Sequence, residues 1–202
     1  MKRKEAIVLT ALKMFNESGI HNVGVREIAR AMSISVGNLS YHFPKKENIV
    51  AQILMLLLAR NNKQFEAFFA APPTVYSYLE LMAGIFGNQY DFRGVAISPL
   101  EIKHIYQQHF DYHAIEDKRK QRQREIFKSL NEAGELKLNE KGIEFFVSYI
   151  TLFSRFWIQE AFLNYDHLSK QEVIEQYLGD LGQQLALFAT PSGLEGIEEF
   201  FV

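Results

Sequence analysis

Histidines and acids stand at metal-binding spacings in one stretch of the chain. His109 and His113 are four residues apart, and Glu101 precedes His104 by three. On a helix, residues three or four apart share a face, so such pairs can hold one metal ion. A helical di-metal enzyme needs a second Glu-x-x-His, which the sequence lacks, and residues 110–112 can interrupt the helix. We expect no metal and no other cofactor, and a metal-dependent helical enzyme stays the less favoured alternative.

Other catalytic chemistry has no visible basis in this sequence. The chain has no cysteine, which excludes thiolate zinc sites and cysteine nucleophiles. It has no phosphate-binding loop, nucleophile elbow or dinucleotide-binding fingerprint. We therefore expect no enzyme. The missing cysteines fit a reducing compartment, and no apolar stretch reads as a membrane span, which together favour the cytoplasm and no membrane partner.

The charges are divided unevenly along the chain. The net charge is −2, yet residues 1–50 hold eight Lys and Arg against four acids, while the rest is acidic overall. Such a basic start on an acidic remainder is expected where only one part touches phosphate.

The spacing of apolar residues is helical nearly everywhere, which predicts an all-α fold. Pro44 and the Pro72-Pro73 pair mark helix ends. Beyond the first three short helices, we expect helices at 46–70, 74–88, 99–110, 114–133, 140–164 and 169–189, and a loose tail after Pro191. We place the domain boundary between residues 1–45 and 46–202.

Residues 24–43 predict two short helices joined by a tight turn at Ser33-Ile34. Ser35 suits the N-cap of the second helix and fixes where it starts. Gly37, in the first turn of that helix, allows its backbone to approach another surface closely. This is the pattern of a helix-turn-helix, whose second helix enters the major groove of DNA.

The first fifty residues resemble the tetracycline-repressor (TetR) family of bacterial regulators. The resemblance rests on spaced residues in one register: Ile7-x3-Ala11-x3-Phe15-x3-Gly19, Arg26-x-Ile28-Ala29, Ile34-Ser35-x-Gly37-x-Leu39-x-Tyr41-His42-Phe43 and Lys46-Glu47-x-Ile49. It implies an N-terminal three-helix helix-turn-helix DNA-binding domain and a C-terminal helical domain for ligand binding and dimerisation.

Four residues depart from the family's usual pattern. Gly24 stands where Thr or Ser is usual, and Ser33 stands where Gly is frequent in the turn. Val36 and Ser40 replace a frequent Lys or other polar residue and a common Tyr. The first pair alters the helix cap and the turn, whereas the second pair alters which DNA sequence is read.

Roles follow for the DNA-contacting residues. Basic side chains at the start of the first helix can reach phosphates, and Tyr41, His42 and Lys46 resemble the family's phosphate contacts. Asn38 can pair with adenine and Val36 can touch a thymine methyl. The alternative is that the polar residues of this helix are ordinary surface. The expected DNA-binding set is Lys2, Arg3, Lys4, Gly24, Arg26, Ser35, Val36, Gly37, Asn38, Ser40, Tyr41, His42 and Lys46.

The stretch 144–162 is apolar almost all round, so it needs cover on every side. We expect one face to pack in its own domain and the other on a second subunit, together with the last long helix. The alternative is a monomer in which both are core helices. The expected dimer interface is Phe146, Tyr149, Ile150, Phe156, Ile174, Tyr177, Leu178, Leu181 and Leu185.

Aromatic residues are concentrated after residue 50, which can mean a pocket between helices or simply a bulky core. The residues expected to bind a lipophilic ligand are Phe86, Tyr90, His104, Tyr106, Phe127, Tyr149, Phe153 and Trp157.

The resemblance implies a ligand-responsive transcriptional regulator, in the family's usual mode a repressor. It binds a palindromic double-stranded operator as a homodimer, and a small, lipophilic effector releases it. The main alternative is a helical protein-interaction module with a degenerate DNA-binding head.

Overall fold

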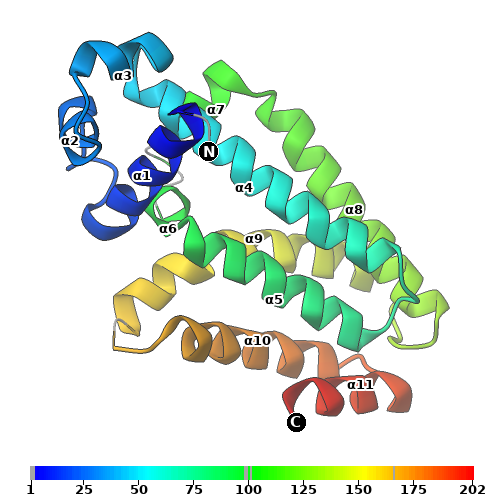
Figure 1. Cartoon of the computed structure of the whole chain (residues 1–202). Coiled ribbons are helices and arrows are strands. Elements are labelled where there is room, and N and C mark those ends of the chain that lie inside the picture. Colours follow the sequence, from blue (N-terminus) through cyan, green and yellow to red (C-terminus); the bar gives the residue numbers. More distant parts are fainter. Residues whose placement is uncertain (1–2, 98–99, 101, 166) are drawn as a thin grey trace. The chain divides into compact units, whose positions relative to one another are not determined.

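The computed structural model describes residues 3–97, 100, 102–165 and 167–202 (Figure 1). Within these ranges every regular element is a helix, apart from one isolated bridge between Leu136 and Ala189, which confirms the predicted all-α fold. The helices are α1 Arg3–Ser18, α2 Val25–Ala31, α3 Val36–His42, α4 Lys46–Phe69, α5 Val75–Asp91, α6 Arg93–Ala96, α7 Lys103–His109, α8 Tyr112–Glu132, α9 Glu140–Asn164, α10 Lys170–Ala186 and α11 Pro191–Phe201.

The chain forms two compact units, each of which is discontinuous in sequence. Unit 1 consists of the residues up to Arg60 together with residues 88–112. Unit 2 consists of residues 61–87 and 113–202. The predicted domain boundary at residue 45 stays a prediction.

Unit 1 is built around the apolar stripe of α1. Ile7, Ala11 and Phe15 recur every four residues and are buried, because this spacing places them on one helical face. The face packs in one cluster with Ile28 of α2 and Leu39 of α3, both fully buried. Aliphatic residues from the first half of α4 and from the segment 88–112 complete this cluster.

Helix α6 packs very closely on α1 through a small residue. A Cβ placed on Gly94 would lie 2.5 Å from the backbone carbon of Phe15, so only glycine fits there. The Asn16 side chain joins the same contact twice: its amide donates to the Asp91 carbonyl (2.7 Å) and its oxygen accepts from the Gly94 N–H (2.7 Å). Asn16 therefore fastens residues 91–94 to α1.

Unit 2 has an aromatic core between α5, α8 and α9. Phe86 packs on Trp157 with ring centroids 4.6 Å apart, and Phe127 packs on Phe146 at 4.9 Å. All four side chains are buried. The predicted ends of α9, residues 140 and 164, are those observed, and Asn139 caps its start by accepting from the Gly142 N–H (2.9 Å).

The prediction of a loose tail after Pro191 is wrong, because these residues form α11. Thr190 caps the helix and accepts from the Gly193 N–H, and Pro191 occupies the first turn. The buried Glu135 holds this start in place: its carboxylate accepts from the Ser192 hydroxyl (2.7 Å) and from the Val75 N–H (2.8 Å). The anchoring partner lies 57 residues away, so the local pattern could not reveal it.

No described helix combines the length and the apolar character that a membrane crossing would need.

Candidate nucleic-acid interface

Helix α2 begins at Gly24, which takes the N-cap position without a side chain. The Glu27 carboxylate reaches back and accepts from the Gly24 N–H at 3.0 Å. Glycine offers no hydroxyl to accept from the first turn, so only one half of a capping box is formed. The first helix of the pair is therefore held by Glu27 and by its buried residues Ile28 and Ala29.

The turn between α2 and α3 is tight and strained at one residue. Ser33 has a φ of 53°, and among described non-glycine residues it alone has a positive φ. The Ser33 N–H donates to the Arg30 carbonyl and the Ile34 N–H to the Ala29 carbonyl, each at 3.0 Å. These are the two bonds of a Schellman motif, in which glycine usually takes the left-handed position. Ser33 thus bears the geometry that the turn requires.

Helix α3 is fixed at its start and on one face. The Ser35 side chain caps it by accepting from the Asn38 N–H at 3.1 Å, as the sequence indicates. Leu39 is fully buried against the core of unit 1. The opposite face is open: Val36, Gly37 and Asn38 are exposed. A rigid helix with an uncovered outer face can be inserted into a groove of DNA.

The end of α3 carries a strongly exposed aromatic side chain. Tyr41 is 85% exposed, and its ring meets His42 edge to face at 5.2 Å between centroids. His42 and Ser40 are half-buried, so they present less surface than Tyr41. Tyr41 can therefore reach a phosphate directly, while Ser40 offers only part of its side chain.

Exposed cations stand on α1 and α2, the helices that share a core with α3. Arg3, Lys4 and Arg26 are exposed, and α3 itself contains no acidic residue. The Lys4 ammonium lies 5.9 Å from the Phe43 ring centre, which puts the start of α1 beside the end of α3. The remaining predicted contact at the N-terminus, Lys2, lies outside the described residues. The cluster of cations suits a polyanion such as the DNA backbone.

The Lys46 side chain makes a hydrogen bond within the protein, apart from the phosphate contact that the sequence predicts. Its ammonium donates to the Ile20 carbonyl at 2.9 Å and is half-buried. This bond ties the loop before α2 to the first turn of α4. Since an ammonium has three donors, the bond leaves capacity for a phosphate. Sequence reasoning missed this structural role because Ile20 lies 26 residues away.

The residues predicted to bind a ligand are divided between the two units, and their common site stays a prediction. Tyr90, His104 and Tyr106 belong to unit 1, whereas the other five belong to unit 2. In unit 2, Phe86, Phe127 and Trp157 are buried in the aromatic core, and Tyr149 and Phe153 are half-buried beside them. None of the eight lines the groove of about 760 Å³ that is formed by residues of α5, α10 and α11.

The residues predicted for the dimer interface divide by exposure. Six of them are buried within the protomer: Phe146, Ile150, Tyr177, Leu178, Leu181 and Leu185. Tyr149 and Ile174 are half-buried, and Phe156 is exposed. Neighbours that the prediction omitted, Phe145, Leu152 and Leu163, are exposed on α9. Tyr177 has a buried hydroxyl without a hydrogen-bond partner in the described part of the chain, and burial raises its pKa to about 12.

The histidines do not gather into a metal site. Helix α7 ends at His109, Phe110 is extended, and α8 starts at Tyr112, so His109 and His113 lie on different helices. Glu101 lies outside the described residues, and His104 is exposed. Among the residues that can be placed, no three potential ligands come together.

Known proteins resemble the chain in two ways. A sequence profile described as "Bacterial regulatory proteins, tetR family" matches residues 7–53. The HTH-type transcriptional regulator RutR of Escherichia coli (strain K12) is 35% identical over 83 residues, which is 39% of each chain. The HTH-type transcriptional regulator YuxN of Bacillus subtilis (strain 168) is 40% identical over 55 residues, covering 27% of this chain and 19% of YuxN. The matched segments thus span well under half of either relative.

The fold likeness extends further than the sequence likeness. A crystal structure of a TetR-family transcriptional regulator from Marinobacter aquaeolei VT8 superposes with a TM-score of 0.85, covering 99% of both chains at 21% identity. This agreement concerns the fold along nearly the whole length. The family profile matches the segment that contains the helix-turn-helix with its exposed α3. Residues 7–53 therefore match the tetR family of bacterial regulatory proteins, and this segment is a helix-turn-helix of the kind with which such transcriptional regulators bind DNA.

Proposed function

We propose that the chain is a ligand-responsive transcriptional repressor in the cytoplasm. Two copies bind a palindromic operator, and a small lipophilic molecule releases them. The observation that carries DNA binding is the open face of α3, which is capped by Ser35 and anchored by Leu39, together with the exposed cations of α1 and α2. Phosphate contacts set the position of such a helix, and base contacts from Val36 and Asn38 give it specificity.

An uncovered apolar stripe on α9 supports the dimer. Phe145, Tyr149, Leu152, Phe156 and Leu163 follow one another at spacings of three, four and seven residues, and Leu152 is 61% exposed. These spacings place all five on one helical face. Exposed apolar side chains in a continuous row mark an interface with another protein. A second copy that packs the same face by two-fold symmetry would also supply the second half of a palindromic reader.

The first experiment is a fluorescence-anisotropy titration of the protein against the DNA that flanks its own gene, with a scrambled duplex beside it. We expect preference for the flanking DNA, saturation at two chains per site and weaker binding at higher salt. Equal, weak binding to both duplexes would contradict the repressor and favour a helical protein-interaction module.

Two substitutions test the phosphate contacts. Arg26→Gln and Tyr41→Ala should weaken binding to both duplexes, and Arg26→Gln should also flatten the dependence on salt. Lys141→Gln is the matched control, because Lys141 is an exposed cation of unit 2, in the first turn of α9. A salt slope that Arg26→Gln leaves unchanged would remove Arg26 from the interface.

The dimer is tested by its mass in solution. Leu152→Glu puts a charge into the middle of the apolar stripe and should yield monomers in analytical ultracentrifugation. Leu100→Glu is the control, since Leu100 is equally an exposed leucine but belongs to unit 1. If Leu152→Glu sediments as the unaltered protein does, α9 is not the interface.

A further inference from the structure

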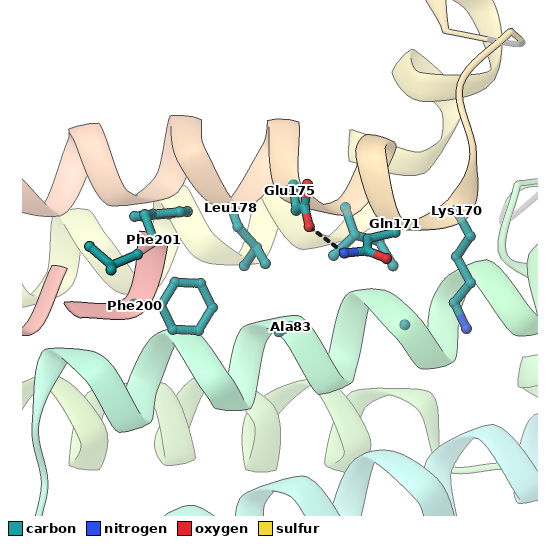
Figure 2. Close-up of a pocket in the computed structure, with 10 residues that line it drawn as sticks. Ala83, Lys170, Gln171, Glu175, Leu178, Phe200 and Phe201 are labelled. Carbon is teal, nitrogen blue, oxygen red and sulfur yellow. Dashed lines mark hydrogen bonds between the residues drawn. The ribbon is translucent and has the colours of Figure 1, made fainter. Parts of the chain in front are cut away.

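A groove of about 760 Å³ lies in unit 2 between α5, α10 and α11 (Figure 2). It is lined along its floor by α5, with Ala83 and Gly87, and along one wall by α10, with Ile174 and Leu178. Figure 2 shows Phe200 and Phe201 of α11 at one end. Its volume lies within the range of about 300–1,000 Å³ that is usual for small-molecule sites. Apart from Lys170, Gln171 and Glu175, the residues that line the groove are apolar.

The space exists because α5 presents its smallest side chains there. Ala83 and Gly87 are four residues apart and share a face. A Cβ on Gly87 would meet nothing within 4 Å, so this stretch of the floor is uncovered. The groove is thus a gap between helices that the packing of unit 2 leaves open.

The apolar end is held firmly by α11. The Phe201 ring packs against Gly182, where an added Cβ would lie 2.9 Å from it, and the Phe200 ring meets Tyr76 at 5.7 Å between centroids. Figure 1 shows α11, in red, beside the end of α10. Hydrogen bonds of Glu135 and Thr190 fix the start of α11. The ring contacts with Gly182 and Tyr76 place the two phenylalanines against α10 and α5.

The other end of the groove is polar. Lys170, Gln171 and Glu175 line it from the first turns of α10. The Gln171 amide donates to the Glu175 carboxylate at 2.8 Å, so this carboxylate has a hydrogen bond within α10. Figure 2 shows the Lys170 side chain extending from α10 towards α5, across the mouth. The positive end of the α10 dipole lies at the same place.

We propose that this groove binds a lipophilic carboxylate, with its hydrocarbon chain along Ala83, Gly87 and Leu178 and its carboxylate at Lys170. An apolar channel with a cation at one end complements a molecule with an apolar chain and a single anionic head. The inference rests on the proposed function in one respect, since it takes this carboxylate to be the effector.

The test uses the full chain and the fluorescent fatty acid 11-(dansylamino)undecanoic acid, displaced by saturated carboxylates. Gly87→Leu fills the floor and should weaken probe binding at least tenfold. Gly179→Leu is the matched control, because Gly179 is also helical with open space at its Cβ but does not line the groove. Circular dichroism and thermal melting of both variants verify that they fold. Equal affinities of Gly87→Leu and the unaltered protein for the probe would overturn the proposal.

The head group is tested by comparing two competitors of equal chain length. Dodecanoate should displace the probe better than dodecanol, and Lys170→Gln should abolish that preference while leaving dodecanol unchanged. Lys141→Gln, an exposed lysine in the first turn of another helix, should keep it. Lengthening the competitor from octanoate to decanoate to dodecanoate should strengthen displacement by roughly tenfold for each two methylenes. A preference that survives Lys170→Gln would overturn the role of Lys170.

Two measurements on the unaltered protein distinguish a failure of the groove proposal from a failure of the proposed function. Operator binding without any carboxylate tests the regulator alone, and probe binding without DNA tests the groove alone. Release of DNA by dodecanoate from the unaltered protein, but not from Gly87→Leu, would establish the carboxylate as effector. DNA binding that saturating dodecanoate leaves unchanged would overturn its role as effector.

Discussion

Gly37→Ala should change protein stability and DNA affinity in opposite directions. Gly37 is the second residue of α3, and an added Cβ would meet only the Ser35 Oγ, at an unstrained 3.9 Å. The free protein therefore accepts the methyl group and gains about 0.5–1 kcal/mol, because glycine loses more backbone freedom on folding than alanine does. Its place in the first helical turn favours the lower end of that range.

Against DNA the same methyl group is a cost. We expect Gly37 to let the backbone of α3 approach DNA closely, so alanine should push the helix outward and weaken operator binding at least tenfold, which is about 1.4 kcal/mol. Urea unfolding gives the first quantity, and anisotropy at two salt concentrations gives the second. Gly179→Ala is the control, because it should raise stability without changing DNA affinity. Stabilisation of Gly37→Ala with unchanged or tighter DNA binding would refute the close approach.

Three further predictions concern strain, an unpartnered hydroxyl and pH. Ser33→Gly should raise the free energy of unfolding, measured in urea, by about 1 kcal/mol. The substitution relieves left-handed backbone strain of ~1–2 kcal/mol, and the greater freedom of glycine in the unfolded chain offsets only part of that gain. An unchanged urea midpoint would contradict this prediction. Tyr177→Phe should raise the free energy of unfolding by about 1 kcal/mol, because it removes a buried hydroxyl that has no hydrogen-bond partner in the described part of the chain, whereas a loss of stability would mean that the hydroxyl has a partner, such as a second subunit. Hydrogen bonds with the Ser169 side chain and backbone hold the pKa of Glu172 below its ordinary value, so their contribution is complete at neutral pH. It is lost as the pH falls from about 4.3 through the lowered pKa, and Glu172→Gln should flatten the stability profile in that window; profiles of equal slope would refute it.

Local patterns predicted the elements well where local physics decides them. Both ends of α9 and the cap at Ser169 follow from residues a few positions apart, and so does the start of α3 at Ser35. The helix-turn-helix could be predicted because its caps, turn and buried faces all lie within twenty residues. Ser33, which stands where glycine is frequent in the turn, has a φ of 53°.

Local patterns could not predict contacts between residues that are far apart in the sequence. Helix α11 depends on Glu135, and the segment 88–112 joins unit 1 through contacts such as that of Asn16 with Gly94. Phe86 packs on Trp157 and Phe127 packs on Phe146, and composition does not tell such a filled core from a cavity, so the ligand-binding residues stay a prediction. The open groove is lined by Ala83 and Gly87, and no local pattern around these small residues indicates a groove.

The discontinuity of unit 1 bears on how such regulators can exchange parts. A single recombination event near residue 45 or 60 would transfer α1 to α3 without residues 88–112, which supply Phe92, Val95 and Ile105 to the same core. The transferred helices would also lose the hydrogen bonds of Asn16 to Asp91 and Gly94. A working hybrid with a foreign DNA specificity therefore needs two inserted segments. Change of specificity by single substitutions on the open face of α3, such as at Val36 or Asn38, leaves that core intact.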